Sequence, residues 1–270
     1  MDFLEHWKLK EKPFENTGDP KFFYYSPSHK EALTRLIYVI RAHKAGALLA
    51  GDYGTGKTTI ANEILHEIKE SGDYQSICIS NPLLTSRELL QEIGFQLGAK
   101  GKITDRVSLR RFIEERLKQT VSEGRHTVLI VDEAHLINKK DVLEELRLLM
   151  NLQYNNNFLV TIIMMGQLEL RDIINSMAQF KQRFAMFYVL KNLNEEDTVR
   201  YIEHRLKISG TDRSMFTPEA SSYVYRSSQG RPRQINNICD MALLVGSLAN
   251  AGCVDENIVR DIVKDLGEKI

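Results

Sequence analysis

The chain has 270 residues, 43% of them hydrophobic, which is enough for one large domain and one small domain with buried cores. Its 36 basic and 36 acidic residues cancel, which excludes a global field that would draw the protein to nucleic acid or to an anionic membrane. The three cysteines show no C-x-x-C spacing, and no apolar run reaches the roughly 18 residues that span a bilayer. We therefore expect a cytoplasmic protein with reduced cysteines and no membrane span.

Helical and strand patterns alternate along the chain up to Asn192. The first element is a helix over residues 28–44, predicted by apolar residues at helical spacing. The elements expected after it are, in chain order, a strand over 46–50, a helix over 57–70, a strand over 75–80, helices over 85–98 and 106–122, a strand over 126–132, a helix over 140–153, a strand over 158–165 and a short strand over 186–190. This alternation predicts an α/β fold, with a parallel sheet sandwiched by helices.

After Asn192 the strands stop and only amphipathic helices are expected. They lie near 195–209, 217–229, 232–250 and 255–267. The break predicts two domains. Residues 1–192 hold an N-terminal segment and the α/β domain, and residues 193–270 form a small all-α lid.

The segment between the strand over 46–50 and the next helix fits the pattern G-x-x-x-x-G-K-[ST]. Glycines let the backbone curl until its N–H groups point at a phosphate, beside the positive N-terminus of the following helix. Lys57 can reach the β- and γ-phosphates, and the Thr58 hydroxyl is placed to ligate Mg²⁺. We predict a nucleoside triphosphate site formed by Gly51, Asp52, Tyr53, Gly54, Thr55, Gly56, Lys57, Thr58 and Thr59.

Two carboxylates follow the β-branched run of the strand over 126–132. Such a run is typical of a buried parallel strand, and ligands bind at the carboxyl ends of parallel strands. Asp132 is predicted to hold Mg²⁺ through water, because Mg²⁺ keeps much of its hydration shell. Glu133 is predicted to orient and deprotonate the attacking water.

Three further polar residues are candidates for the same reaction. Gln167 follows the strand over 158–165 and could hold the water; its alternative role is to cap the next helix. Arg183 precedes the last strand and could reach a neighbouring subunit's nucleotide, where an arginine stabilises the transferred charge; its alternative is a surface salt bridge. Arg233 follows Pro232 at the first turn of a lid helix and could report the γ-phosphate to the lid.

The ordered set of these motifs resembles the AAA+ ATPases. More narrowly, it is similar to the general secretion pathway protein A (ExeA-type) family and to related pilus-biogenesis and transposition (TniB/TnsC-type) ATPases. The resemblance extends over nearly the whole chain, including Tyr25-Ser26-Pro27-Ser28-His29 near the N-terminus. It implies ATP and Mg²⁺, hydrolysis at subunit interfaces, and a homo-oligomer of ring or filament type. By matched position, Lys57 and Thr58 take the phosphate and metal roles, Asp132 the metal role, Glu133 the water-activating role, Arg183 the trans-acting finger and Arg233 the lid sensor.

The chain departs from the family pattern in two places. Many AAA+ proteins have Asn, Thr or Ser at the sensor position that Gln167 takes here. Secretion members also continue into a membrane span and a periplasmic peptidoglycan-binding region, whereas this sequence stops at Ile270.

Two functions fit the resemblance. The first is an oligomerising ATPase that remodels or recruits a protein partner in secretion or pilus assembly. The alternative is an ATP-gated matchmaker that assembles on duplex DNA and selects a target for a transposase. The residues that would contact DNA phosphates, or that would otherwise form a solvated helix face, are Lys100, Lys102, Arg106, Arg110 and Arg111.

Overall fold

The computed structural model describes residues 3–100, 103 and 105–267. The chain divides into two compact units. The first unit consists of Met1–His29, Tyr53–Thr59 and Lys191–Ile270. The second consists of Lys30–Asp52 and Ile60–Leu190. The first unit therefore joins the loop after the first strand to segments that are distant from it in the sequence.

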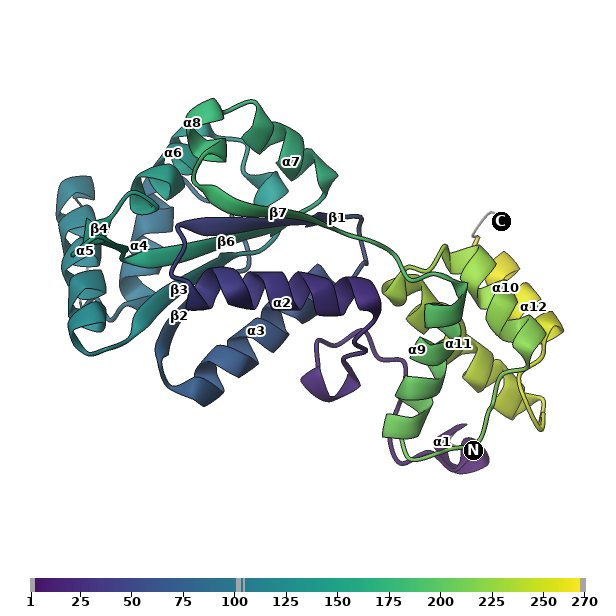
Figure 1. The fold of residues 1–270 in the computed structure, drawn as a ribbon. Coiled ribbons are helices and arrows are strands. Elements are labelled where there is room, and N and C mark those ends of the chain that lie inside the picture. Colours follow the sequence, from purple (N-terminus) through teal and green to yellow (C-terminus); the bar gives the residue numbers. More distant parts are fainter. Residues whose placement is uncertain (1–2, 101–102, 104, 268–270) are drawn as a thin grey trace. The chain divides into compact units, whose positions relative to one another are not determined.

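The second unit is built on a parallel sheet of five strands, as predicted. The strand order is β2-β3-β6-β1-β7, so the three central strands are β3, β6 and β1 (Figure 1). Every residue of these three strands is buried, as expected for a sheet covered on both faces. The strands are β1 (Gly46–Gly51), β2 (Tyr74–Ile79), β3 (His126–Val131), β6 (Val160–Gly166) and β7 (Phe184–Leu190).

Helices cover both faces of this sheet (Figure 1). Helices α2 (Pro27–Arg41) and α3 (Lys57–Ser71) lie on one face. One hydrophobic core joins the other face to the remaining helices, through side chains such as Leu48, Leu89 and Leu146. Those helices are α4 (Ser86–Gln96), α5 (Arg106–Ser122), α6 (Lys140–Leu149), α7 (Leu168–Asn175) and α8 (Ala178–Lys181).

The structure ends α6 earlier than the sequence predicts. Helix α6 stops at Leu149, and a hairpin of β4 (Gln153–Tyr154) and β5 (Asn157–Phe158) follows. Asn155 and Asn156 both have positive φ, at 49° and 62°, which suits a two-residue turn between right-twisted strands. The predicted helix was too long because apolar residues continue at helical spacing past the true end.

The helices of the first unit surround a separate hydrophobic core. Trp7 is buried in it, and its indole N–H donates to the Leu243 carbonyl over 2.7 Å. None of the helices in the described ranges combines the length and the apolar character that crossing a bilayer requires. The elements are α1 (Phe3–Trp7), the 3₁₀ turn η1 (Pro20–Phe22), α9 (Glu195–Ile208), α10 (Pro218–Ser228), α11 (Pro232–Leu248) and α12 (Glu256–Asp265).

A buried histidine opens β3 in the second unit. The His126 ring stacks on His43, with centroids 4.1 Å apart and planes 7° from parallel. Its Nε2 lies 2.9 Å from Thr161 Oγ1, and that hydroxyl donates its own proton to the Lys44 carbonyl. His126 must therefore donate from Nε2. Burial, together with the His43 ring, lowers the pKa of His126 from 6.5 to about 3.

This pKa shift predicts acid sensitivity. The folded state keeps His126 neutral while the unfolded chain takes up a proton below pH 6.5, so the stabilisation present above 6.5 is lost as pH falls toward about 3. We expect this one residue to lower the unfolding free energy by up to roughly 1.4 kcal/mol per pH unit in that window. Urea unfolding between pH 7 and pH 4 measures the slope. In His126→Gln, where residue 126 does not titrate, the slope should be smaller by up to roughly 1.4 kcal/mol per pH unit, which corresponds to one proton. Equal slopes in the two proteins would contradict the lowered pKa of His126.

Candidate nucleotide-binding site

The phosphate-binding loop connects β1 to α3, in the predicted position. Gly51 is the last residue of β1, and Lys57 and Thr58 begin α3, so the first N–H groups of this helix line the loop. Thr55 is fully buried and Lys57 is 5% exposed. The chemistry of the segment is that of an anion cradle, because a lysine and a helix N-terminus both favour negative charge there.

A histidine from the N-terminal segment holds this loop within the first unit. His29 Nε2 lies 2.9 Å from the Thr55 carbonyl oxygen, and Nδ1 lies 2.7 Å from Ser26 Oγ. Since a carbonyl only accepts, Nε2 carries the proton and Ser26 donates to Nδ1. Burial lowers the pKa of His29, which favours this neutral form. Gly56 has a φ of +99°, and a Cβ there would lie 2.9 Å from His29 Nε2, so both backbone and space require glycine.

Sequence reasoning missed Ser26 and His29 as parts of the site. The stretch that contains them enters only through the resemblance to the family, which assigns these two residues no role. The available signal was a serine three residues before a histidine at the start of a helix, a spacing at which the Ser26 hydroxyl can accept from the His29 backbone N–H, here over 3.3 Å.

Arg233 lies against the same loop, also within the first unit. Its backbone N–H is 3.4 Å from the Gly54 carbonyl oxygen, and its guanidinium lies over the Tyr53 ring, 5.1 Å from the centroid. Pro232 occupies the first turn of α11, where a backbone N–H would have no partner within the helix, so proline costs no hydrogen bond there. The start of α11 thus places an arginine beside the phosphate-binding loop.

Asp132 and Glu133 follow directly after β3, at the carboxyl edge of the sheet in the second unit. The chain enters the phosphate-binding loop from the same edge, because β1 and β3 are parallel and both flank β6. Asp132 is 6% exposed, and its Oδ1 accepts the Glu133 N–H over 2.8 Å. Glu133 adopts a left-handed conformation, with φ 49° and ψ 31°, which is uncommon for a residue other than glycine.

Gln167 lies at the end of β6, the neighbour of β3 in the sheet. It occupies the N-cap position of α7, but its side chain makes no capping hydrogen bond. The Gln167 side chain therefore does not cap α7, which was its alternative role. The sheet places Asp132, Glu133 and Gln167 at the ends of adjacent strands.

Arg183 lies at the opposite edge of the sheet. It immediately precedes β7, whose seven residues alone span about 20 Å between the two edges. Its Nε is buried without a hydrogen-bond partner in the described part of the chain. Within one chain, Arg183 is separated from the carboxylates after β3 by the length of the sheet.

The side chains predicted to hold Mg²⁺ are oxygen donors of the kind that Mg²⁺ takes together with a nucleotide. Mg²⁺ takes one or two carboxylates, hydroxyls and substrate phosphates rather than an all-protein cage. Asp132 offers a carboxylate held in place by the Glu133 N–H, and Thr58 offers a hydroxyl in the first turn of α3. These oxygen ligands match the preference of a hard cation.

A parallel sheet with a phosphate-binding loop after one strand and paired carboxylates after another defines a P-loop nucleoside triphosphatase. The chain belongs to the AAA domain family, whose model matches residues 40–174, half of its length. It is an AAA+ ATPase, as the resemblance predicted.

One curated relative is General secretion pathway protein A of Aeromonas hydrophila, which is 36% identical over 247 residues. The match covers 90% of this chain but 44% of that protein, so this chain spans less than half of the relative's length.

Solved structures confirm the fold. The Drosophila ORC bound to DNA superposes with a TM-score of 0.75 at 17% identity, covering 98% of this chain and 66% of that one. Cdc6p from Pyrobaculum aerophilum superposes with a TM-score of 0.71 at 13% identity, covering 92% of this chain and 70% of that one. At these identities the likeness establishes the architecture alone.

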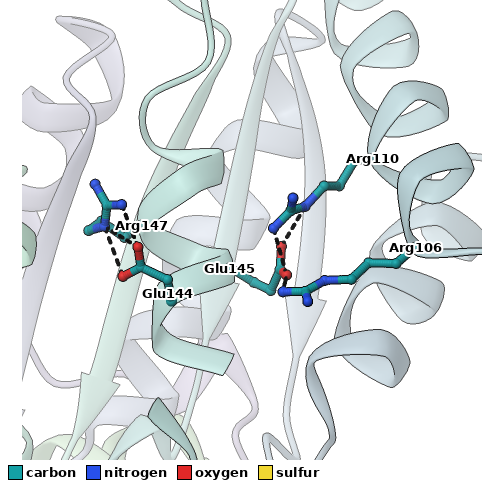
Figure 2. A network of polar contacts seen from close by, with 5 residues as sticks. All are labelled: Arg106, Arg110, Glu144, Glu145 and Arg147. Atoms are coloured by element: carbon teal, nitrogen blue, oxygen red, sulfur yellow. Dashed lines mark hydrogen bonds and ion pairs between the residues drawn. The ribbon is translucent and has the colours of Figure 1, made fainter. Parts of the chain in front are cut away.

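Two of the basic residues suggested for DNA form ion pairs inside the second unit (Figure 2). Arg110 makes hydrogen bonds of 2.8 and 2.9 Å to the Glu145 carboxylate, and Arg106 contacts the same carboxylate. The Glu145 side chain is 1% exposed, so both guanidinium groups neutralise a buried charge. Lys102 lies outside the described residues.

The Glu145 network predicts a stability effect. Glu145→Ala should lower the unfolding free energy by about 2 kcal/mol. The loss stays below the roughly 3–5 kcal/mol of a fully buried pair because Arg106 and Arg110 are 47% and 40% exposed and regain water. Urea unfolding of the wild type and of Glu145→Ala measures this loss of unfolding free energy. Glu144→Ala is the matched control, since Glu144 is 44% exposed and pairs with Arg147 on the same helix; it should cost under about 1 kcal/mol. Equal losses would contradict the buried role.

Proposed function

We propose that this AAA+ ATPase binds ATP with Mg²⁺ and hydrolyses it where two copies of the chain meet. ATP-dependent assembly would then remodel or recruit a protein partner in secretion or pilus assembly, on the cytoplasmic side where ATP is supplied. The position of Arg183 carries this proposal. It lies at the sheet edge opposite the carboxylates after β3, so its guanidinium suits a neighbouring copy's nucleotide better than its own.

The residues take the following roles in this proposal. The loop from Gly51 to Thr59 binds the phosphates, and Thr58 and Asp132 would hold Mg²⁺. The bound ion would neutralise charge on the phosphates. Glu133 accepts a proton from the attacking water, and Gln167 helps to orient that water. Arg233 senses the nucleotide from its place beside Gly54, and residues 193–270 act as the lid.

The pathway is supported by the similarity to General secretion pathway protein A. An assembly on duplex DNA, with a transposase as partner, is the second candidate. It is supported by a likeness in fold to the Drosophila ORC, which was solved bound to DNA. The ion pairs of Arg106 and Arg110 with Glu145 count against it, because a guanidinium that neutralises a buried carboxylate is less available to a phosphate.

Electron microscopy with a slowly hydrolysed ATP analogue, with and without duplex DNA, tests both candidates. The first predicts rings or filaments that need the analogue and not DNA. Assembly that requires duplex DNA and weakens steeply with salt would favour the second. Lys57→Ala, which removes the phosphate-binding cation, is the control and should not assemble. A protein that stays a single copy yet hydrolyses ATP at full rate would contradict hydrolysis between subunits.

A further inference from the structure

A histidine two residues after Glu133 lies against the Glu133 carboxylate. Nδ1 of His135 is 3.5 Å from Oε2 of Glu133. The His135 side chain is 11% exposed, whereas that of Glu133 is 36% exposed. Within the described ranges this Nδ1 has no hydrogen-bond partner. Buried polar atoms are nearly always paired, so an unpaired one beside a reactive carboxylate calls for an explanation.

The backbone brings the two side chains together. Glu133 turns the chain with its left-handed conformation, and its carbonyl accepts the Leu136 N–H over 2.9 Å. The resulting 3₁₀ turn, η2 (Ala134–Leu136), carries His135 back toward the residue before the turn. Left-handed conformations at residues other than glycine persist where the surrounding structure enforces them, and they cluster at functional sites.

The end of β6 confines the His135 ring from another side. A Cβ on Gly166 would lie 3.0 Å from the His135 backbone nitrogen and 3.2 Å from Nδ1. Only glycine therefore leaves the ring in its place without displacement. The ring is held between Glu133 and the strand that ends beside Gln167. A side chain confined in this way can fix the direction of a neighbouring group.

We propose that His135 is a positioning residue for ATP hydrolysis: its Nδ1–H donates to the Glu133 carboxylate and points it at the attacking water. This role rests on the proposed function, in which Glu133 accepts the proton of that water. The separation of 3.5 Å exceeds an ordinary hydrogen bond, and such contacts commonly tighten when substrate is bound. Because a base must be held close to its productive geometry, loss of this donor lowers the turnover number rather than ATP affinity.

Two substitutions separate hydrogen bonding from packing, and a third is a control. His135→Leu keeps bulk and removes the donor. His135→Asn keeps a donor near the position of Nδ1 and removes most of the ring. His66→Ala is the control for a general effect of losing a histidine, because His66 is exposed on α3. Turnover, KM and ATP affinity are measured for each protein, with thermal unfolding to verify that each is folded.

We expect His135→Leu to lower kcat roughly ten- to a hundredfold with KM and ATP affinity unchanged, and His135→Asn to recover most of the loss. Gly166→Ala, which pushes the ring from the other side, should also lower kcat. Wild-type turnover in His135→Leu, a rise in turnover, or a loss in His135→Asn as large as that in His135→Leu would each overturn the proposal. A folded wild type that binds ATP without hydrolysing it would instead refute the proposed function, and this role with it.

Discussion

Glu133→Gln should bind ATP as tightly as the wild type and hydrolyse it roughly 10²- to 10⁴-fold more slowly. The amide cannot accept the proton of the attacking water, whereas it keeps the size of the glutamate and can still accept a hydrogen bond from His135. The left-handed turn at residue 133 should therefore persist. Phosphate release measures turnover, and calorimetry measures ATP affinity.

The control for this variant is Glu169→Gln. Glu169 is an exposed carboxylate in the first turn of α7, close in sequence to Gln167 and outside the proposed roles. The Glu169→Gln variant should hydrolyse ATP like the wild type. If Glu133→Gln also kept full turnover, the water would have to be activated by a different group, and the assignment of Glu133 would be wrong.

Arg183→Ala is expected to reduce turnover on the order of a thousandfold while each subunit still binds ATP. The reason is positional. In the proposed arrangement the guanidinium contributes charge to the nucleotide of the adjacent copy, so its loss would affect the reaction and not the phosphate-binding loop of its own chain. Lys181→Ala removes a nearby exposed cation on α8 and should have little effect.

Mixing the two inactive variants tests whether Arg183 acts in trans. At some interfaces an Arg183→Ala subunit binds the ATP and supplies an intact Glu133, while the adjacent Glu133→Gln subunit supplies an intact Arg183. Random assembly of equal amounts makes about a quarter of the interfaces competent, so activity should reappear on mixing. Failure to recover activity, with mixed oligomers demonstrated, would contradict the action of Arg183 in trans.

The phosphate-binding loop and the carboxylate pair could be predicted because their signals are local. Lys57 and Thr58 belong to one continuous motif, and the β-branched run before Asp132 identifies a buried strand without knowledge of its neighbours. The parallel sheet follows from the alternation of strands and helices. Small errors occurred where a pattern continued past an element, as in the overlong prediction for α6.

Contacts between segments that are distant in the sequence could not be predicted in this way. His29 hydrogen-bonds to Thr55, 26 residues further along, and Arg110 pairs with Glu145 across 35 residues. A sequence pattern reports the periodicity of one element, but it does not specify which side chains meet across the fold. From the sequence, Arg106 and Arg110 could contact DNA phosphates or form a solvated helix face, whereas the structure pairs both with a buried carboxylate.

The sequence by itself determined the class of protein, since the nine-residue loop and the two adjacent carboxylates are each a continuous local pattern. The tertiary structure alone decided the strand order and the approach of His135 to Glu133. The physical reason is that both depend on how segments pack against one another, and packing depends on complementary surfaces contributed by the whole chain.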